Sequence, residues 1–348
     1  MSEALRMWVE IVFNITYLVV VWGMVILMQW RKSVVASPDR PIVDPHHHLW
    51  PDRYTLDDLH ADTGSGHRVE KTVFVECRAS YRDDGPEHLR PVGETEFVAQ
   101  AAAESAAGPG ATIAAIVAHA DLRLGVRLDE VLDAHEAAGG GLLRGIRHSG
   151  AHAGELASSL SIPGRAPAGL YADPAFHAGV RRLGERGLSY DTWHYHFQNR
   201  DFLALARAVP GTTLVLDHFG TPLGVGPYAA QRDEIFDQWK LDIAEIASCP
   251  NVVAKLGGLA MPDNGFGWDR AARPPSSDEF AEAQAPYYLH TLERFGAERC
   301  MMESNFPVDR RSLSYRVLYN GLKKIVAGCS EGEKDALFSG TATRVYRL

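Results

Sequence analysis

The fold is decided by a unit that starts with "KTVFVEC" (71–77), continues through "RASYRDDGPEHLRPVG" (78–93) and ends with "ETEFVAQAAAESAAG" (94–108). The first segment is a short apolar run rich in β-branched residues, which is typical of a parallel strand buried on both faces. The second contains Gly, Pro and charged residues, as loops do. The third is long enough, and rich enough in alanine, to predict a helix. Together they predict one βα unit.

The same unit recurs along the chain. Eight strands alternating with helices from Pro41 to Leu348 predict a single (β/α)8 TIM barrel. A doubly wound open sheet is the alternative, but no G-x-G-x-x-G or Walker A sequence opens a helix after the first strand. The seven further runs are "PIVDPH" (41–46), "ATIAAIVAHA" (111–120), "LLRGIRH" (142–148), "GLSYDTW" (187–193), "TTLVLDH" (212–218), "NVVAKL" (251–256) and "RCMMES" (299–304).

Composition excludes several classes of protein. The 348 residues are 46% hydrophobic and 23% charged, with a formal net charge of −9. A negative chain without a Lys/Arg run predicts no nucleic-acid partner. The four cysteines are scattered and form no C-x-x-C pair. They predict reduced thiols of a cytosolic fold rather than a disulfide framework or a zinc knuckle.

The N-terminal segment "IVFNITYLVVVWGMVILMQW" (11–30) has no charged residue. A helix of this length would span roughly 30 Å, the thickness of a bilayer core. Arg31 and Lys32 follow at once, so the positive-inside rule predicts a transmembrane helix with its C-terminal side in the cytoplasm. A signal peptide cleaved after "VVA" (34–36) and an appendage foreign to the fold are the alternatives. The predicted division is a hydrophobic helix and linker over 1–40 and the barrel over 41–348.

Histidines stand at the end of the first predicted strand, in "DPHHHLW" (44–50). Because side chains alternate along an extended segment, His46 and His48 point to the same face and His47 points away. Catalytic groups of a barrel lie at the C-terminal ends of its strands. We therefore expect His46 and His48 to enter an active site and His47 to pack outward.

Matching polar residues follow other predicted strands. Arg147 ends the fourth run, His196 follows the fifth, His218 ends the sixth, and Glu303 and Asn305 follow the eighth. Imidazole is the commonest metal ligand in proteins and titrates near neutral pH. An H-x-H pair with a distant third histidine suits Zn²⁺, which would polarise a carbonyl and acidify a bound water.

Seven stretches in this order resemble the amidohydrolase superfamily, and within it the amidohydrolase-2 group of metal-dependent TIM-barrel hydrolases. That group contains sugar-acid lactonases and 2-pyrone-4,6-dicarboxylate lactonase. The similarity covers Pro41 to Leu348 and is specific for family and fold rather than for substrate. The stretches are "DPHHHLW", "YRDDGPEHLRPVGETEFVA", "GIRHSGA", "YDTWHYHFQ", "LDHFGTPLG", "NVVAKLGGLAMPDNGFGWDR" and "MMESNFPVDR".

The resemblance implies roles for individual residues. It makes His46, His48 and His196 the groups that contact a divalent metal or the substrate carbonyl, and it matches His218 to a histidine after strand six. Arg147 matches an arginine that in lactonase relatives contacts a substrate carboxylate, for which a planar guanidinium is suited. Zn²⁺ is the expected metal, although some lactonases of the group are described as working without one.

The eighth strand departs from the pattern of the superfamily. A stretch similar to "GSDWP" usually supplies an aspartate that takes a proton from the attacking water, but "ESNFPVD" (303–309) places Asn305 there. An amide has no basic site near neutral pH. Glu303 lies two residues earlier, on the same face of an extended segment, and is the expected base. A gating or salt-bridged Glu303 is the alternative, and Asp309 lies beyond the strand.

Two loops carry further candidate residues. The loop after the second strand would add Tyr81 and Arg82 to a substrate site. The segment 257–277, rich in Gly, Pro and aromatic residues, would form a lid with Phe266 and Trp268 near the mouth of the barrel. A structural role for either loop is the alternative.

The expected function is hydrolysis of a lactone or related cyclic ester of a carboxylated or sugar-derived small molecule. A metal-dependent non-oxidative decarboxylase of an aromatic acid is one alternative, and a membrane-tethered barrel without catalysis is another. The expected partners are a small-molecule substrate and the membrane, through residues 11–30; a homo-oligomer is left open. The catalytic domain would be cytoplasmic and membrane-anchored, or simply cytoplasmic if the N-terminal segment is not native.

Overall fold

The computed structural model describes residues 35–348, and Ser37–Leu348 form one unit. The transmembrane helix expected over 11–30 lies outside the described residues. Within 35–348, no helix is both long enough and apolar enough to cross a membrane.

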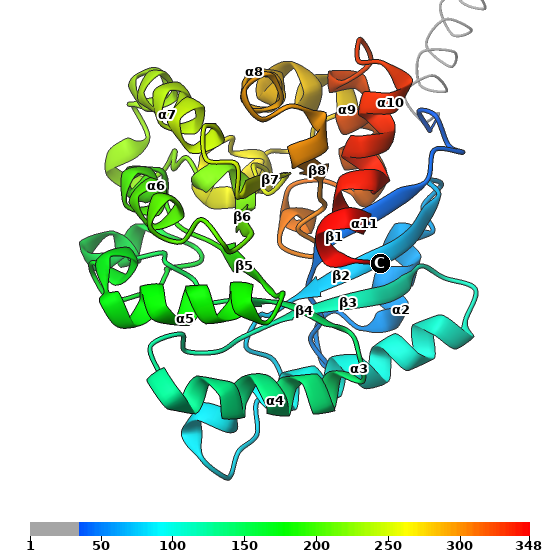
Figure 1. Ribbon diagram of the computed structural model, residues 1–348. Helices are drawn as coiled ribbons and strands as arrows, with labels where there is room; N and C mark the ends of the chain where they lie inside the picture. Colours follow the sequence, from blue (N-terminus) through cyan, green and yellow to red (C-terminus); the bar gives the residue numbers. More distant parts are fainter. Residues whose placement is uncertain (1–34) are drawn as a thin grey trace, which may run out of the picture. The chain divides into compact units, whose positions relative to one another are not determined.

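Eight parallel strands follow one another around a barrel in chain order (Figure 1). All eight lie within or beside the runs predicted from sequence, so the predicted (β/α)8 fold is confirmed. They are β1 (Ile42–His47), β2 (Val69–Val75), β3 (Thr112–Ala118), β4 (Leu143–Arg147), β5 (Ser189–Thr192), β6 (Leu214–Leu216), β7 (Val252–Leu256) and β8 (Cys300–Met302).

The barrel closes just beyond the last strand. The amide of Asn305 donates to the carbonyl of His46 at 3.0 Å, and the amide of His48 donates to the carbonyl of Phe306 at 2.8 Å. A parallel bridge joins His47 to Phe306. The segment after β8 therefore fixes the C-terminal end of β1, where the histidines stand.

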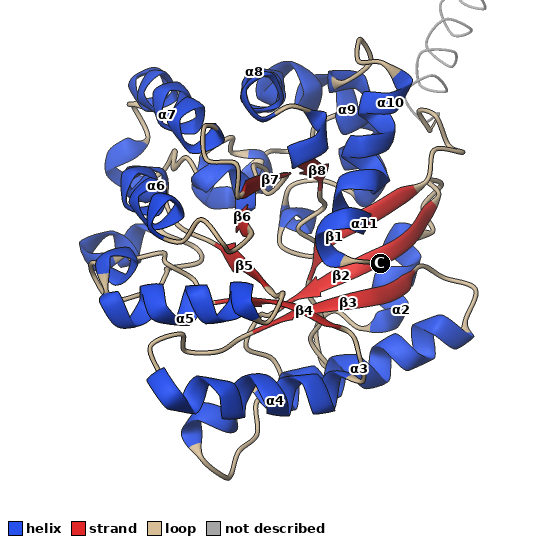
Figure 2. Ribbon diagram, in the orientation of Figure 1, coloured by secondary structure: helices blue, strands red, loops and turns tan. Residues whose placement is uncertain are grey.

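Helices alternate with the strands and form the outer layer (Figure 2). α5 begins with Asp173 accepting from the amide of Ala175, and Ser276 and Glu279 form a capping box at the start of α8. The helices are α2 (Leu56–Thr63), α3 (Val92–Ala107), α4 (Leu128–Gly139), α5 (Pro174–Glu185), α6 (Asn199–Ala208), α7 (Arg232–Ala247), α8 (Ser277–Phe295), α9 (Tyr315–Ile325), α10 (Glu331–Asp335) and α11 (Thr341–Tyr346).

The barrel interior changes character along the strands. Val215, Val253 and Met301 belong to an apolar cluster that also contains Ala342 and Tyr346 of α11. Asp217, Lys255 and Glu303 lie two residues after Val215, Val253 and Met301, respectively, and so point to the same face. All three are fully buried. The packed apolar layer thus supports a charged layer at the C-terminal ends of the strands.

Candidate active site

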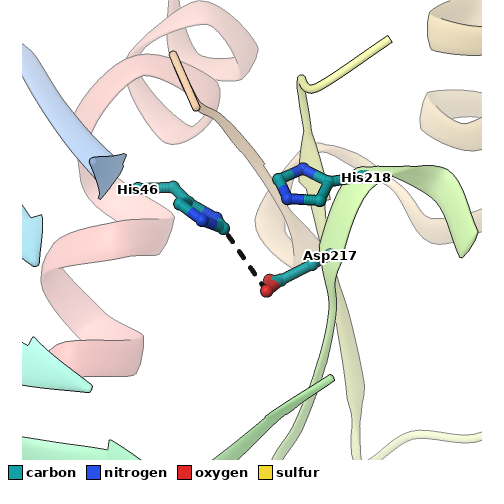
Figure 3. Close-up of side chains that lie close together, drawn as sticks. All are labelled: His46, Asp217 and His218. Atoms are coloured by element: carbon teal, nitrogen blue, oxygen red, sulfur yellow. Dashed lines mark ion pairs between the residues drawn. The ribbon is translucent and has the colours of Figure 1, made fainter. Parts of the chain in front are cut away.

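The charged layer brings together His46, Asp217 and His218 (Figure 3). His46 comes from the end of β1, and Asp217 and His218 directly follow β6. One ligand atom of each residue lies within 4.8 Å of those of the other two, and all three residues are buried. Among the described residues, they form the one group of three or more His, Cys, Asp or Glu side chains placed to hold a metal ion.

Glu303 joins this cluster from the segment after β8. Its Oε2 lies 2.7 Å from His46 Nδ1, and its Oε1 lies 2.7 Å from His218 Nδ1. The carboxyl group of Glu303 therefore bridges the two rings. We call His46, Asp217, His218 and Glu303 the histidine–carboxylate cluster.

Local backbone strain accompanies the cluster. His218 and Phe219 have φ values of 55° and 59°, and Asn305 has a φ of 56°. Non-glycine residues pay roughly 1–2 kcal/mol in this left-handed region, so the surrounding packing must enforce it. The turn after β6 directs both Asp217 and His218 into the cluster.

Burial controls the protonation of the cluster. It raises the pKa of Glu303 to about 8 and that of Asp217 to about 6. Burial also lowers the pKa of His218 to about 3, and burial followed by the charge of Lys255 holds the pKa of His46 well below its usual value. Both rings are therefore neutral, as metal ligands must be. A bound cation would favour the ionised carboxylates.

Two buried cations balance the carboxylates. Lys255 on β7 places Nζ 2.8 Å from Asp191 Oδ2 and 3.2 Å from Asp217 Oδ1. Arg147 at the end of β4 places Nη1 3.7 Å from Asp217 Oδ2 and 3.4 Å from His46 Nε2. Glu76, which follows β2, accepts from Nε of Arg147 at 2.9 Å. Charged residues in buried strands need such partners.

The cluster fits a divalent metal ion. His46 Nδ1, both carboxylate oxygens of Asp217, and Glu303 Oε2 are buried and lack a hydrogen bond of acceptable geometry within the described chain. Their contacts are ion pairs with one another, with Lys255 and with Arg147, so acceptor positions remain for a cation. Two neutral imidazoles with carboxylates are a donor set that Zn²⁺ accepts. The cluster is therefore the candidate divalent-metal site of the barrel.

A cavity of about 700 Å³ opens beside the cluster. His48, Glu76 and Arg147 line its wall, and His119 and His148 contribute from the ends of β3 and β4. A volume of this size accommodates a small organic substrate.

The predicted metal ligands His46, His48 and His196 are not the set that the structure assembles. His48 lines the cavity, but its Nδ1 contacts the carbonyl oxygen of Val75 at 2.8 Å. His196 lies four residues beyond β5, packs on Tyr228 with ring centroids 5.0 Å apart, and lines a different cavity. Its position past the strand end, on a short 3-10 helix, carries it away from the cluster.

The three polar residues after β8, Glu303, Asn305 and Asp309, have different contacts. The amide side chain of Asn305 donates to Asp309 Oδ1 at 2.8 Å, and Asp309 also accepts from the amide of Ala260. The side chains of Asn305 and Asp309 therefore bind each other. Of these three side chains, that of Glu303 is the one that contacts the histidine rings.

The predicted loop residues lie beside or outside the cavity. Tyr81 is stacked on His119 with ring centroids 6.4 Å apart, and Arg82 pairs with Glu96. Trp268 stacks on Phe266 at 5.0 Å and is absent from the cavity wall. From the segment after β2, the residues that line the cavity are Glu76, Cys77 and Arg78.

Sequence reasoning assigned no role to Lys255 or Glu76 and no metal-binding role to Asp217. A signal for them existed, because each is a charged residue within or directly after an otherwise apolar strand run. A charge in such a position must be paired or bound to a ligand. His47 was expected to face outward, and its ring contacts Thr72 and Phe74 on the outer face of β2.

Comparison with known proteins places this geometry in a family. Residues 43–348 match the family described as amidohydrolase. The chain belongs to the amidohydrolase family. It is therefore a hydrolase, and the alternative of a barrel without catalysis falls away.

Individual relatives resemble the chain over nearly their whole length. It is 31% identical to the uncharacterized protein y4mH of Sinorhizobium fredii over 329 residues, covering 89% of this chain and 99% of the relative. It is 27% identical to L-fucono-1,5-lactonase of Burkholderia multivorans over 321 residues, covering 88% and 96%. A crystal structure of an amidohydrolase from Burkholderia multivorans with bound Zn matches with a TM-score of 0.64 and 27% identity, covering 88% and 99%.

Proposed function

We propose that this amidohydrolase hydrolyses a lactone, with Glu303 as the base that activates water. The bridging position of Glu303, 2.7 Å from both His46 Nδ1 and His218 Nδ1, carries the proposal. The likeness to L-fucono-1,5-lactonase supports a lactone as the substrate. A general base must lie within hydrogen-bond reach of the water it deprotonates. His48 and Arg147 line the cavity and both contact His46, so the water would reach Glu303 past these side chains.

The residues divide the reaction between them. Glu303 in its carboxylate form accepts a proton from water as the water oxygen bonds to the lactone carbonyl carbon. Arg147, whose Nη1 lies 3.4 Å from His46 Nε2, is placed to stabilise negative charge on the former carbonyl oxygen. The ring C–O bond then breaks, and the proton on Glu303 passes to the departing oxygen. The product is the open-chain hydroxy acid.

The histidine–carboxylate cluster would hold the metal through His46, His218 and Asp217. When bound, a divalent ion supplies Lewis-acid polarisation and lowers the pKa of a coordinated water. Lys255 holds Asp217 in place through an ion pair, and the apolar layer of the barrel keeps bulk water out of the interior.

A panel of lactones in weakly buffered pH indicator tests the proposal. Ring opening at neutral pH releases a proton, because the new carboxylic acid ionises, whereas decarboxylation consumes one. We expect acidification with at least one lactone and none with carboxylated aromatics. Alkalinisation with a carboxylated aromatic, and no response to any lactone, would replace the proposal with the decarboxylase alternative.

A further inference from the structure

Residues 154–163, in the loop between β4 and α5, form part of the cavity wall but have little packing of their own. None of these ten residues is buried. Segments with few buried side chains open locally at a small cost in free energy, while the core stays folded. We call residues 154–163 the flap. Three of its residues line the cavity: Ser161, Ile162 and Pro163.

The base of the flap is firmly packed. An antiparallel bridge joins His152 to Arg165, and the amide of Ala166 donates to the carbonyl of Ala151 at 2.9 Å. Ala151 and Ala166 are both buried. The amide of Ala151 also donates to the carbonyl of Trp193 at 2.9 Å, which ties the base to the segment after β5. The base therefore belongs to the rigid part of the barrel.

Glycines stand where the flap meets its base. Gly154 has a φ of 51°, in the left-handed region that costs other residues roughly 1–2 kcal/mol. A Cβ at Gly164 would lie 2.3 Å from the carbonyl oxygen of Ala151, so no larger residue fits there. Small residues at the ends of a loop can absorb the change in backbone angles that a hinge needs.

The centre of the flap is held by one carboxylate from another loop. Asp263, after β7, accepts from the amide and the hydroxyl of Ser161, both at 2.7 Å, and from the amide of Ile162 at 3.1 Å. The hydroxyl of Tyr195 accepts from the amide of Gly164 at 2.7 Å. Residues 259–264 around Asp263 are all buried, so the carboxylate is the fixed side of this contact and the flap is the exposed side.

We propose that residues 154–163 open and close over the cavity, with Asp263 as the latch that holds the flap closed. Each hydrogen bond to an ionised carboxylate contributes about 1.5–3 kcal/mol, so the closed state predominates. Opening exchanges these bonds for bonds to water and leaves the barrel intact. The loop after β7, predicted to be a lid, would then carry the latch, while the loop after β4 moves. This inference does not depend on which reaction the cavity supports.

Hydrogen exchange of the full chain, followed by mass spectrometry, measures the opening. The amides of Ser161 and Ile162 are bonded to Asp263 and exchange when the latch is released. We expect their exchange rates to stay constant in low concentrations of urea, because local opening exposes little surface. The amides of β6 and β7 should exchange more slowly and respond to urea. Exchange of Ser161 and Ile162 through global unfolding alone would overturn the inference.

Substitution of the latch should increase the opening. We expect Asp263→Ala to raise the exchange rates of these two amides by about 100-fold, and Asp263→Asn by about tenfold, because the amide keeps one acceptor oxygen. Asp269→Ala is the control, since Asp269 lies in the same loop but pairs with Arg270 rather than with the flap. Exchange rates that are unaltered in both Asp263 variants would show that Asp263 is not a latch.

A thiol in the cavity reports whether the flap admits a small molecule. Cys77 lines the cavity, and Cys329, between α9 and α10, serves as an internal reference. We expect iodoacetamide, in mildly alkaline buffer, to alkylate Cys77 about tenfold or more faster in Asp263→Ala than in the wild type, as the open state becomes more populated. Alkylation of Cys329 should not change. Equal rates at Cys77 in the two proteins would overturn the flap as a gate. Neither measurement needs a lactone, so failure of the lactonase proposal would leave this test intact.

Discussion

At the scale of single residues, the metal-binding cluster contains His218, whereas the ligand set predicted from sequence contains His196. His218 is buried with Glu303 Oε1 2.7 Å from its ring, whereas His196 faces another cavity. The metal content of purified variants therefore distinguishes a site that contains His218 from one that contains His196. We expect His218→Asn to lose most of the bound metal, since removal of a ligand weakens a site strongly, and His196→Asn to retain it. Metal retained in the first variant and lost in the second would show that the cluster is assigned wrongly.

Lys255 illustrates how a buried charge depends on its partners. It is fully buried and lies within 3.2 Å of both Asp191 and Asp217. Lys255→Met would leave two carboxylates facing each other without their cation, and we expect about 3–5 kcal/mol of lost stability in urea unfolding. Lys240→Met is the control, because Lys240 is an exposed partner of Asp237 and such pairs contribute about 1 kcal/mol or less. Similar losses in both variants would contradict the account.

At the scale of elements, α4 is joined to α3 and β3 through a neutral histidine. His135 Nδ1 lies 2.8 Å from Thr95 Oγ1, and its Nε2 lies 2.9 Å from the carbonyl oxygen of His119. The neutral ring satisfies both contacts when Nε2 donates to the carbonyl and Nδ1 accepts from the hydroxyl. Burial lowers the pKa of His135 to about 4.

This pKa predicts a pH dependence of stability. The unfolded chain, with a histidine pKa near 6.5, takes up a proton before the folded one does. The contribution of His135 is therefore complete above about pH 6.5 and is lost as the pH falls toward 4. The difference in unfolding free energy between wild type and His135→Gln should shrink over that range, by up to about 1.4 kcal/mol per pH unit. A difference that is constant with pH would contradict this.

The elements also show what sequence could and could not predict. Near-continuous apolar runs located all eight strands, because both faces of a barrel strand are buried. The residues His46, Arg147, His218 and Glu303 were found because they end such runs. The metal-binding place of Asp217 and the role of Lys255 were missed because their partners come from other strands, and the ring of strands brings them together only after folding.

At the scale of the whole molecule, every residue of the cluster and of its cavity belongs to the unit Ser37–Leu348. A protein that begins at Ser37 should therefore fold and turn over substrate at the rate of the full chain. Circular dichroism and the lactone assay, run on both forms side by side, measure this. Loss of folding or of turnover in the shortened protein would mean that the N-terminal residues contribute to the barrel.

The turnover of Glu303→Gln on one hydrolysed lactone tests the central claim most directly. The amide preserves the shape of the side chain but cannot accept a proton from water. We predict a fall in kcat of roughly 10²–10⁴-fold, the usual contribution of a general base, with little change in binding of the hydroxy-acid product. Glu104→Gln, on the exposed side of α3, should keep full turnover. Full turnover in Glu303→Gln would contradict the assignment of Glu303 as the base.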